Sequence, residues 1–210
     1  MTIPALKDSI NIVASDLDGT LLAPNHKLSD FTKQTLKKLH QQGFTFIFAT
    51  GRHHVDVAGI RQQAGIPAYM ITSNGARVHD QDDQLMYSQN VPQELVQPVV
   101  DIVRQEPNIF IHMYQNEDWL LDREDEMLAK FHSESGFSYQ RFEAERAPTE
   151  GIAKVFFTHP EHDHEHLVTF EQRLRKAFGD KLNIAFSTPW CLEVVAAEVS
   201  TEALVELAAS

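Results

Sequence analysis

The sequence of 210 residues contains one cysteine, Cys191, and no apolar run near the ~20 residues that a membrane-spanning helix needs. A single cysteine excludes an internal disulfide framework and is typical of proteins from a reducing compartment. Residues 1–15 lack the charged and then apolar layout of a secretory signal. We therefore expect a cytoplasmic protein without a membrane partner.

Basic residues are also scarce, with 18 Lys and Arg against 30 Asp and Glu, which gives a formal net charge of −12. An acidic surface repels nucleic acids and anionic membranes, so neither is an expected partner. A small anionic substrate remains compatible with this charge when a metal ion or local hydrogen-bond donors offset the field. Hydrophobic residues make up 42% of the chain, which is ordinary for a globular protein with a core.

The first part of the chain alternates strand and helix patterns. Apolar runs rich in β-branched and aromatic residues predict strands at 10–15, 44–49 and 68–72. Caps delimit the two helices between them, with Ser29 and Gly43 around the first and Gly65 after the second. The apolar face of the first helix is predicted to hold Leu28, Phe31, Leu36 and Leu39. Strand, helix, strand, helix, strand is the order of a parallel sheet with right-handed crossovers.

The pattern changes after about Ser88. We predict helices at 92–105, 124–135 and 167–178, and strands at 109–114, 119–121, 152–157, 182–187 and 191–195. Strands that alternate in polarity around short turns are typical of antiparallel pairing. The sequence therefore predicts a second domain of α+β type at 88–188, inserted between a first domain at 1–87 and a return to it at 189–210.

The string that carries chemistry directly follows the first predicted strand and reads Asp16-Leu17-Asp18-Gly19-Thr20. Reactive groups of parallel-sheet proteins gather at the carboxyl ends of strands. One carboxylate can attack a phosphorus atom, while the other donates a proton to the leaving oxygen and later activates water. A divalent cation must screen two carboxylates and a phosphate, and the side chain of Asp16 with the backbone carbonyl of Asp18 could hold it. The simpler interpretation is a surface turn, which explains Asp-Gly alone but not the whole string after a buried strand.

Polar groups also follow the second and third predicted strands. Thr50 lies between a strand and a helix, where free backbone N–H groups favour an anion. Asn74 and Gly75 offer a hydrogen-bond donor and a flexible turn. Helix capping for Thr50 and an ordinary turn for Asn74 are the alternatives, and Arg52 fits a phosphate contact or a surface position equally well.

Three strings together resemble the haloacid dehalogenase superfamily. Residues 16–22 look like its first motif, Ala49-Thr50-Gly51-Arg52 resembles its second, and Ser73-Asn74-Gly75-Ala76 is similar to a signature of its Cof-type subfamily. The resemblance implies an α/β fold, with a Rossmann-like parallel-sheet core and an inserted α+β cap. It also implies Mg²⁺-dependent hydrolysis of a small phosphate monoester, such as pyridoxal phosphate or a sugar phosphate, through an aspartyl-phosphate at Asp16 with Asp18 as acid and base. The residues that it assigns to substrate or phosphate binding are Leu17, Gly19, Thr20, Thr50, Gly51, Arg52, Asn74 and Gly75.

The sequence departs from that family in two places. Thr201 stands where a Val-Ser-Lys-Gly-type string would carry the lysine of the third motif, and the Gly-Asp-Gly-x-Asn-Asp string of the fourth motif does not occur. We expect a truncated core that lacks on the order of 60 residues, or two βα units, at its C-terminal side. Lys154 is the candidate substitute for the lysine, and it either contacts substrate or faces solvent.

These departures have two expected consequences. Weak Mg²⁺ binding and an unscreened nucleophile would leave activity very low, so the competing hypothesis is a non-catalytic remnant that keeps the fold and weak phosphate binding. In the family's strand order the first strand lies inside the sheet, so losing its outer neighbour would expose an edge that invites self-association.

Other reactive residues have simpler interpretations. His162 and His166 have the i, i+4 spacing of metal ligands, but an acidic, solvated helix start is favoured, with adventitious zinc or nickel as the alternative. Packing is the favoured role of Cys191 and of Trp119 and Trp190.

Overall fold

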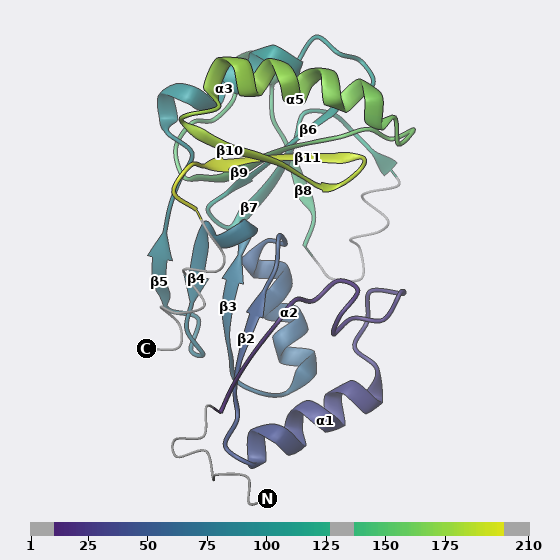
Figure 1. Ribbon diagram of the computed structural model, residues 1–210, viewed down its shortest axis with the longest axis vertical. Coiled ribbons are helices and arrows are strands. Elements are labelled where there is room, and N and C mark those ends of the chain that lie inside the picture. Colours follow the sequence, from purple (N-terminus) through teal and green to yellow (C-terminus); the bar gives the residue numbers. More distant parts are fainter. Residues whose placement is uncertain (1–10, 127–136, 200–210) are drawn as a thin grey trace, which may run out of the picture.

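A computed structural model describes residues 11–126 and 137–199, which form two β-sheets with their helices (Figure 1). Three expectations lie outside the described residues: the first predicted strand before residue 11, the helix at 124–135 beyond residue 126, and Ser200, Thr201 and the tail that follows. Among the described helices, none combines the length and the apolar content needed to cross a membrane.

The first sheet has five strands in the order β1-β2-β3-β4-β5. Its elements are β1 (Ile12–Ser15), α1 (Asp30–Gln41), β2 (Thr45–Ala49), α2 (His54–Ala64), β3 (Ala68–Thr72), the 3-10 turn η1 (Ser73–Gly75), β4 (Arg77–His79) and β5 (Leu85–Ser88). β1, β2 and β3 are parallel, which confirms the predicted order of strands and helices. The antiparallel hairpin of β4 and β5 was not predicted.

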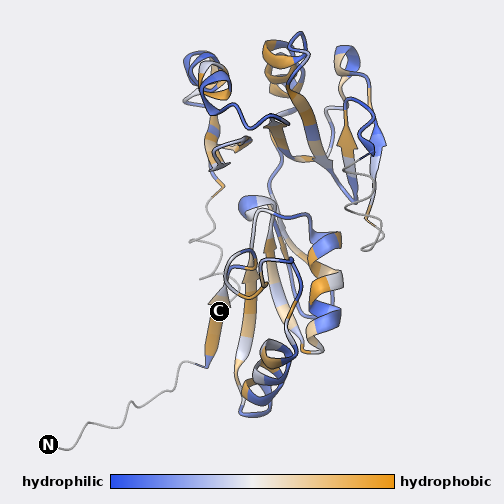
Figure 2. Cartoon of the chain, turned by 90° about the vertical axis from the view of Figure 1, so that its right-hand side faces the viewer, coloured by the Kyte–Doolittle hydropathy of each residue, from blue (hydrophilic) through white to orange (hydrophobic). Residues whose placement is uncertain are grey.

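Alternation along β2 decides which side chains meet the helices. Phe46 and Phe48 are buried in one cluster with Val57 of α2 and Leu36 of α1, whereas Ile47 points to the opposite face. Figure 2 shows the two helices on one side of this sheet, with hydrophobic residues concentrated along the strands. The result is one α/β layer pair, with the helices packed against one face of the sheet.

The predicted caps of this layer are largely confirmed. Ser29 Oγ accepts the N–H of Thr32 at 3.0 Å, and Gly65 ends α2 in the left-handed region with φ of 65°. The expectation for Phe31 was wrong, because this side chain is 79% exposed. At ~100° per residue, Phe31 lies about 140° around the helix from buried Leu36 and so on a different face.

The second sheet has six strands in the order β10-β11-β9-β6-β7-β8. Its elements are α3 (Gln93–Val103), β6 (Phe110–Gln115), β7 (Asp118–Leu121), β8 (Tyr139–Arg141), the 3-10 turn η2 (Ala144–Arg146), β9 (Ile152–Thr158), α5 (His164–Phe178), β10 (Leu182–Thr188) and β11 (Cys191–Ala196). The boundary expected at 188 assigns β11 to the first domain. The strand instead pairs with both β10 and β9, so the second sheet extends to Ala196.

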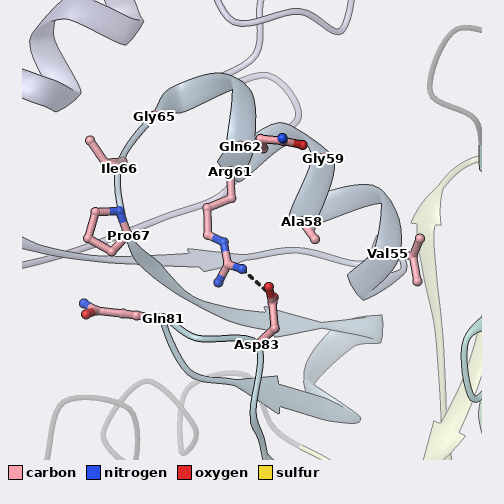
Figure 3. Close-up of a pocket in the computed structure, with 10 residues that line it drawn as sticks. All are labelled: Val55, Ala58, Gly59, Arg61, Gln62, Gly65, Ile66, Pro67, Gln81 and Asp83. Atoms are coloured by element: carbon pink, nitrogen blue, oxygen red, sulfur yellow. Dashed lines mark hydrogen bonds and ion pairs between the residues drawn. The ribbon is translucent and has the colours of Figure 1, made fainter.

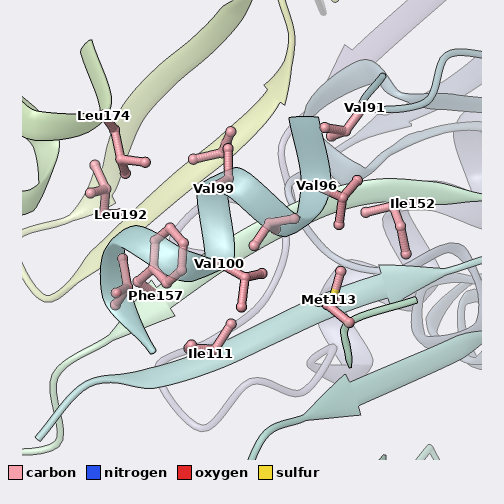
Figure 4. Close-up of a cluster of buried hydrophobic side chains, with 14 of the residues drawn as sticks. Val91, Val96, Val99, Val100, Ile111, Met113, Ile152, Phe157, Leu174 and Leu192 are labelled. Atoms are coloured by element: carbon pink, nitrogen blue, oxygen red, sulfur yellow. The ribbon is translucent and has the colours of Figure 1, made fainter. Parts of the chain in front are cut away.

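Apolar residues three and four apart on α3 build the core of this second layer pair. Val96, Val99 and Val100 are fully buried and pack against Ile111 and Phe157 of the sheet (Figure 4). α3 and α5 cover the face of the sheet that is turned away from the first sheet (Figure 1). The other face therefore meets the first sheet, at the end where β1, β2 and β3 finish.

Candidate active site

The carboxyl ends of β1, β2 and β3 bring three loops together at one end of these strands. The parallel register aligns these strands, so the loops after Ser15, Ala49 and Thr72 begin side by side. Backbone hydrogen bonds join two of the loops: the N–H of Thr50 donates to Ile71 at 2.9 Å, and that of Asn74 donates to Thr50 at 3.3 Å. All three predicted motifs therefore lie at this end of the strands.

The first loop is a tight turn anchored in the core. The side chain of Leu17 is fully buried, and its carbonyl accepts the N–H groups of Thr20 at 3.3 Å and of Leu22 at 2.8 Å. Gly19 adopts φ of 75°, a conformation that side chains disfavour. Asp16 is exposed, and its Oδ1 accepts the N–H of Leu17 at 2.7 Å. This bond orients the carboxylate and uses the one hydrogen that the backbone of Leu17 could have offered to a phosphate.

Arg52 forms a bidentate ion pair with Asp18, which has the second carboxylate of this loop. Its Nε donates to Asp18 Oδ2 and its Nη2 to Oδ1, both at 2.7 Å, while Nη1 donates to Asp56 at 2.7 Å. His26 Nδ1 lies 3.1 Å from Asp18 Oδ1. The hydrogen bonds from Arg52 hold the pKa of the Asp18 carboxyl below its ordinary value. Asp18 is therefore a carboxylate in this geometry.

The second and third loops meet a lysine from the other sheet. Lys154 Nζ donates to the carbonyl of Gly51 at 2.6 Å and to Glu193 Oε1 at 2.9 Å. Asn74 Nδ2 donates to the other oxygen of Glu193. A Cβ at Gly51 would lie 2.5 Å from Asn74 Oδ1, so any other residue there would displace the side chain of Asn74.

Of the two roles left open for Lys154, facing solvent is excluded. The residue is 2% exposed. Its ammonium also lies 4.9 Å from the ring centre of Tyr114 and 4.8 Å from that of Phe156. The lysine is thus a fixed charge beside the second-motif loop.

Three histidines stack where the two sheets meet. The rings of His53 and His54 lie 4.4 Å apart and those of His54 and His79 4.5 Å apart. His53 bonds through Nε2 to the carbonyl of Asn116, and His54 to Glu117, so helix α2 is tied to the turn between β6 and β7. Burial lowers the pKa of His53 to about 3 and that of His79 to about 4, which leaves both neutral at pH 7.

Stability is expected to fall as the stack is acidified. In the unfolded chain His53 and His79 titrate near 6.5, so between about pH 6.5 and 4 the unfolded state binds more protons than the folded state. Wild type should lose about 1–2 kcal/mol more unfolding free energy between pH 7 and 5 than His79→Leu. Urea unfolding at the two pH values measures the difference, and exposed His40→Gln is the control. Equal losses of unfolding free energy in wild type and His79→Leu would contradict a His79 that is buried and neutral in the folded protein.

A hollow beside α2 is lined by residues outside the three loops. Figure 3 shows Arg61 reaching toward Asp83 across it, with Pro67 and Val55 on its rim. Its lining contains none of the residues of the three motifs. The hollow is therefore separate from the polar groups of these loops.

Cys191, Trp119 and Trp190, for which packing is the simpler interpretation, make the following contacts. Burial raises the pKa of the Cys191 thiol to about 11, so it is a poor nucleophile. Trp119 is buried against the His112 ring, and Trp190, 40% exposed, stacks on His162 with ring centres 4.4 Å apart.

Glu193, His26 and Asn116 were not predicted to belong to this region. A charged residue between buried Leu192 and Val194 is the one signal that could have indicated Glu193, because acidic residues are rarely buried without a partner. Nothing in the sequence pattern distinguishes His26 or Asn116 from ordinary turn residues.

The oxygen atoms that the first loop offers as ligands fit a magnesium ion. Mg²⁺ prefers oxygen ligands, is often bound by one or two carboxylates, and keeps several waters or phosphate oxygens. Asp16 offers an exposed carboxylate, and the neighbouring backbone carbonyl of Asp18 offers a second oxygen. The side chain of Asp18 is occupied by Arg52 and is the poorer donor in this geometry.

Comparisons with known proteins agree with the motifs. A family model described as haloacid dehalogenase-like hydrolase matches residues 13–209. A Haemophilus influenzae protein, named only provisionally as a phosphatase, is 41% identical over 189 residues, which are 90% of this chain and 69% of that protein. A Yersinia pestis protein named HMP-PP phosphatase is 37% identical over 184 residues, 88% of this chain and 66% of its own length.

A solved structure shares the fold. A haloacid dehalogenase-like hydrolase from Bacteroides thetaiotaomicron aligns with a TM-score of 0.82 at 19% identity, covering 95% of this chain and 76% of that one. This likeness confirms the predicted α/β fold and concerns the fold alone. The chain spans about two thirds of the length of the curated relatives.

Proposed function

The chain belongs to the haloacid dehalogenase-like hydrolase family, and from that premise we propose that it hydrolyses a small phosphate monoester through an aspartyl-phosphate at Asp16. The observation that carries the proposal is the meeting of three polar loops at the carboxyl ends of three parallel strands, β1, β2 and β3. Open α/β sheets bind ligands in the crevice at the carboxyl ends of their strands.

Each residue has a task in this proposal. Asp16 attacks phosphorus, and the Leu17 N–H keeps its carboxylate oriented. In this proposal the hydroxyl of Thr50 and the backbone N–H groups of Gly19 and Gly75 bind the phosphate oxygens. When bound to Asp16 and the carbonyl of Asp18, Mg²⁺ would supply positive charge that offsets the repulsion between carboxylate and phosphate.

Arg52 controls when Asp18 can work. The bidentate pair with Arg52 lowers the pKa of the Asp18 carboxyl further while the site holds no phosphate. A phosphate dianion competes for the guanidinium, because Arg binds both groups with the same planar fork. Once Arg52 turns to the phosphate, the negative charge of the phosphate beside Asp18 raises the pKa of this carboxyl, so that it can take up a proton and serve as acid and then as base.

Phosphate release from p-nitrophenyl phosphate, pyridoxal phosphate, a sugar phosphate and HMP-PP tests the proposal. Turnover is expected with Mg²⁺ and should be lost when EDTA removes it. No release from any substrate, with or without Mg²⁺, would overturn the proposal.

One observation favours a second candidate function, which is phosphate binding without turnover. Asp18 is fully engaged by Arg52, and a chain that never releases it could bind phosphate but not cleave it. In that case inorganic phosphate would bind in calorimetry while every substrate stays intact.

We also propose that a second copy of the chain pairs with β1. Among residues 11–126 and 137–199, β1 has β2 on one side and no strand on the other. An open strand edge offers unpaired N–H and C=O groups to another chain.

Sedimentation of wild type should depend on concentration, and Ala14→Lys on this edge should abolish the dependence. The control is Leu85→Lys on β5, the opposite edge of the sheet. A wild type that stays monomeric, or an association lost only in the control, would contradict the proposal.

A further inference from the structure

Two histidines and an aspartate meet where β9 passes into α5. His159 follows the last residue of β9, Asp163 is the N-cap of α5, and His166 lies in its first turn. Ligand atoms of the three side chains lie within 4.8 Å of one another. None of these residues belongs to the loops assigned above to phosphate chemistry.

The two rings are spaced as ligands of one ion. His159 Nε2 lies 3.2 Å from His166 Nδ1. Two nitrogens bound tetrahedrally at ~2.0–2.1 Å are about 3.3 Å apart, so both rings can reach one ion with small movements. The ring of His159 is fixed by burial, since the residue is 2% exposed.

Surrounding groups orient these ligands. Glu106 Oε2 lies 3.6 Å from His166 Nε2, the nitrogen that points away from His159. A carboxylate near the outer nitrogen favours a proton there, which leaves the inner nitrogen available as a ligand. Asp163 Oδ1 accepts the backbone N–H of His166 at 3.0 Å, which fixes the carboxylate of the third candidate ligand at the helix start.

One contact must change when an ion binds. The N–H of Glu161 donates to His159 Nδ1 at 3.2 Å, so in the free protein Nε2 carries the ring proton and donates it to His166. Metal at Nε2 moves the proton to Nδ1 and breaks the bond from Glu161. This residue is exposed, so water replaces the lost acceptor.

We propose that His159, Asp163 and His166 bind one divalent transition-metal ion of the zinc, nickel and cobalt class. Two imidazoles and one carboxylate favour such ions over Mg²⁺, which prefers oxygen alone. Sequence spacing paired His166 with His162, but the His162 ring stacks on Trp190 and His159 takes its place. The ion would fasten the end of β9 to the start of α5, and it leaves a coordination position for water.

Metal titration of untagged, chelator-treated protein tests this site. Zn²⁺ binding is followed by calorimetry and Co²⁺ binding by its visible absorption, in an Asp16→Asn background that weakens the magnesium site. One equivalent of metal is expected, with visible cobalt bands typical of a low-coordinate site. The proposal does not depend on turnover, so failure of the phosphatase assay leaves it untouched.

Single substitutions identify the ligands. His159→Gln and His166→Gln should each weaken Zn²⁺ binding by at least about 100-fold, and Glu106→Gln by about 10- to 100-fold. Asp163→Asn keeps an N-cap oxygen, so it should fold normally and still lose affinity. The matched control is His164→Gln, because His164 lies in the same turn but bonds to the carbonyl of Pro189. Absence of stoichiometric binding in wild type, or unchanged affinity in folded His166→Gln and Asp163→Asn, would overturn the proposal.

Discussion

Asp16→Asn is expected to lower the rate of phosphate release by about a thousandfold or more, because the amide cannot attack phosphorus. The change is nearly isosteric, and the Asn oxygen can still accept the N–H of Leu17. The fold and the phosphate-binding groups should therefore survive. Steady-state rates with Mg²⁺, together with thermal unfolding of both proteins, measure the two effects separately.

A matched control distinguishes the loss of the nucleophile from the loss of one negative charge. Asp30 has a 93% exposed carboxylate on α1 and makes one 3.8 Å ion pair with Lys33. Asp30→Asn removes the same charge from the same domain and should leave the rate within about twofold. A rate in Asp16→Asn equal to that of wild type would exclude Asp16 as nucleophile.

Lys154→Met is expected to destabilise the protein by about 3–5 kcal/mol. The lysine and its partner Glu193 have side chains only 2% and 8% exposed, so removing the ammonium leaves a buried carboxylate without its compensating charge. The carbonyl of Gly51 also loses its donor. Urea unfolding followed by circular dichroism measures the loss.

Two further variants assign this loss to the pair. Lys154→Met combined with Glu193→Gln should recover more than half of the stability, because Gln keeps the acceptor for Asn74 without a buried charge. Lys181→Met, at an exposed lysine, should change stability by less than about 0.5 kcal/mol. Equal stability of Lys154→Met and wild type would show that the pair is solvated in solution.

The network around Lys154 connects stability with the proposed chemistry. Its hydrogen bond fixes Gly51, whose neighbours Thr50 and Arg52 belong to the second motif. Because the lysine comes from β9 and Glu193 from β11, the second sheet helps to position a loop of the first. Loosening this contact should therefore also weaken phosphate binding.

The order of elements in the first sheet could be predicted from sequence because each signal is local. The run at 44–49, the cap Ser29 and the terminator Gly65 each report on a few neighbouring residues. The same holds for the Asp16 motif, which directly follows its strand. Local patterns gave the place of the loops and hence the edge of the sheet where the chemistry is proposed.

Contacts between distant residues could not be predicted in this way. Arg52 and Asp18 are 34 residues apart, and Lys154 and Glu193 are 39 apart. Periodicity reports which face a residue takes but not which residue it meets there. β11 shows the same limit, because an apolar strand fits either sheet and only its pairing with β9 and β10 decides.

Acid-quenched mass spectrometry during turnover tests the central claim most directly. The account predicts one phosphoryl group on the peptide that contains Asp16 in wild type, and none on that peptide in Asp16→Asn. Turnover without a phosphorylated peptide, or a phosphoryl group on any other residue, would contradict it.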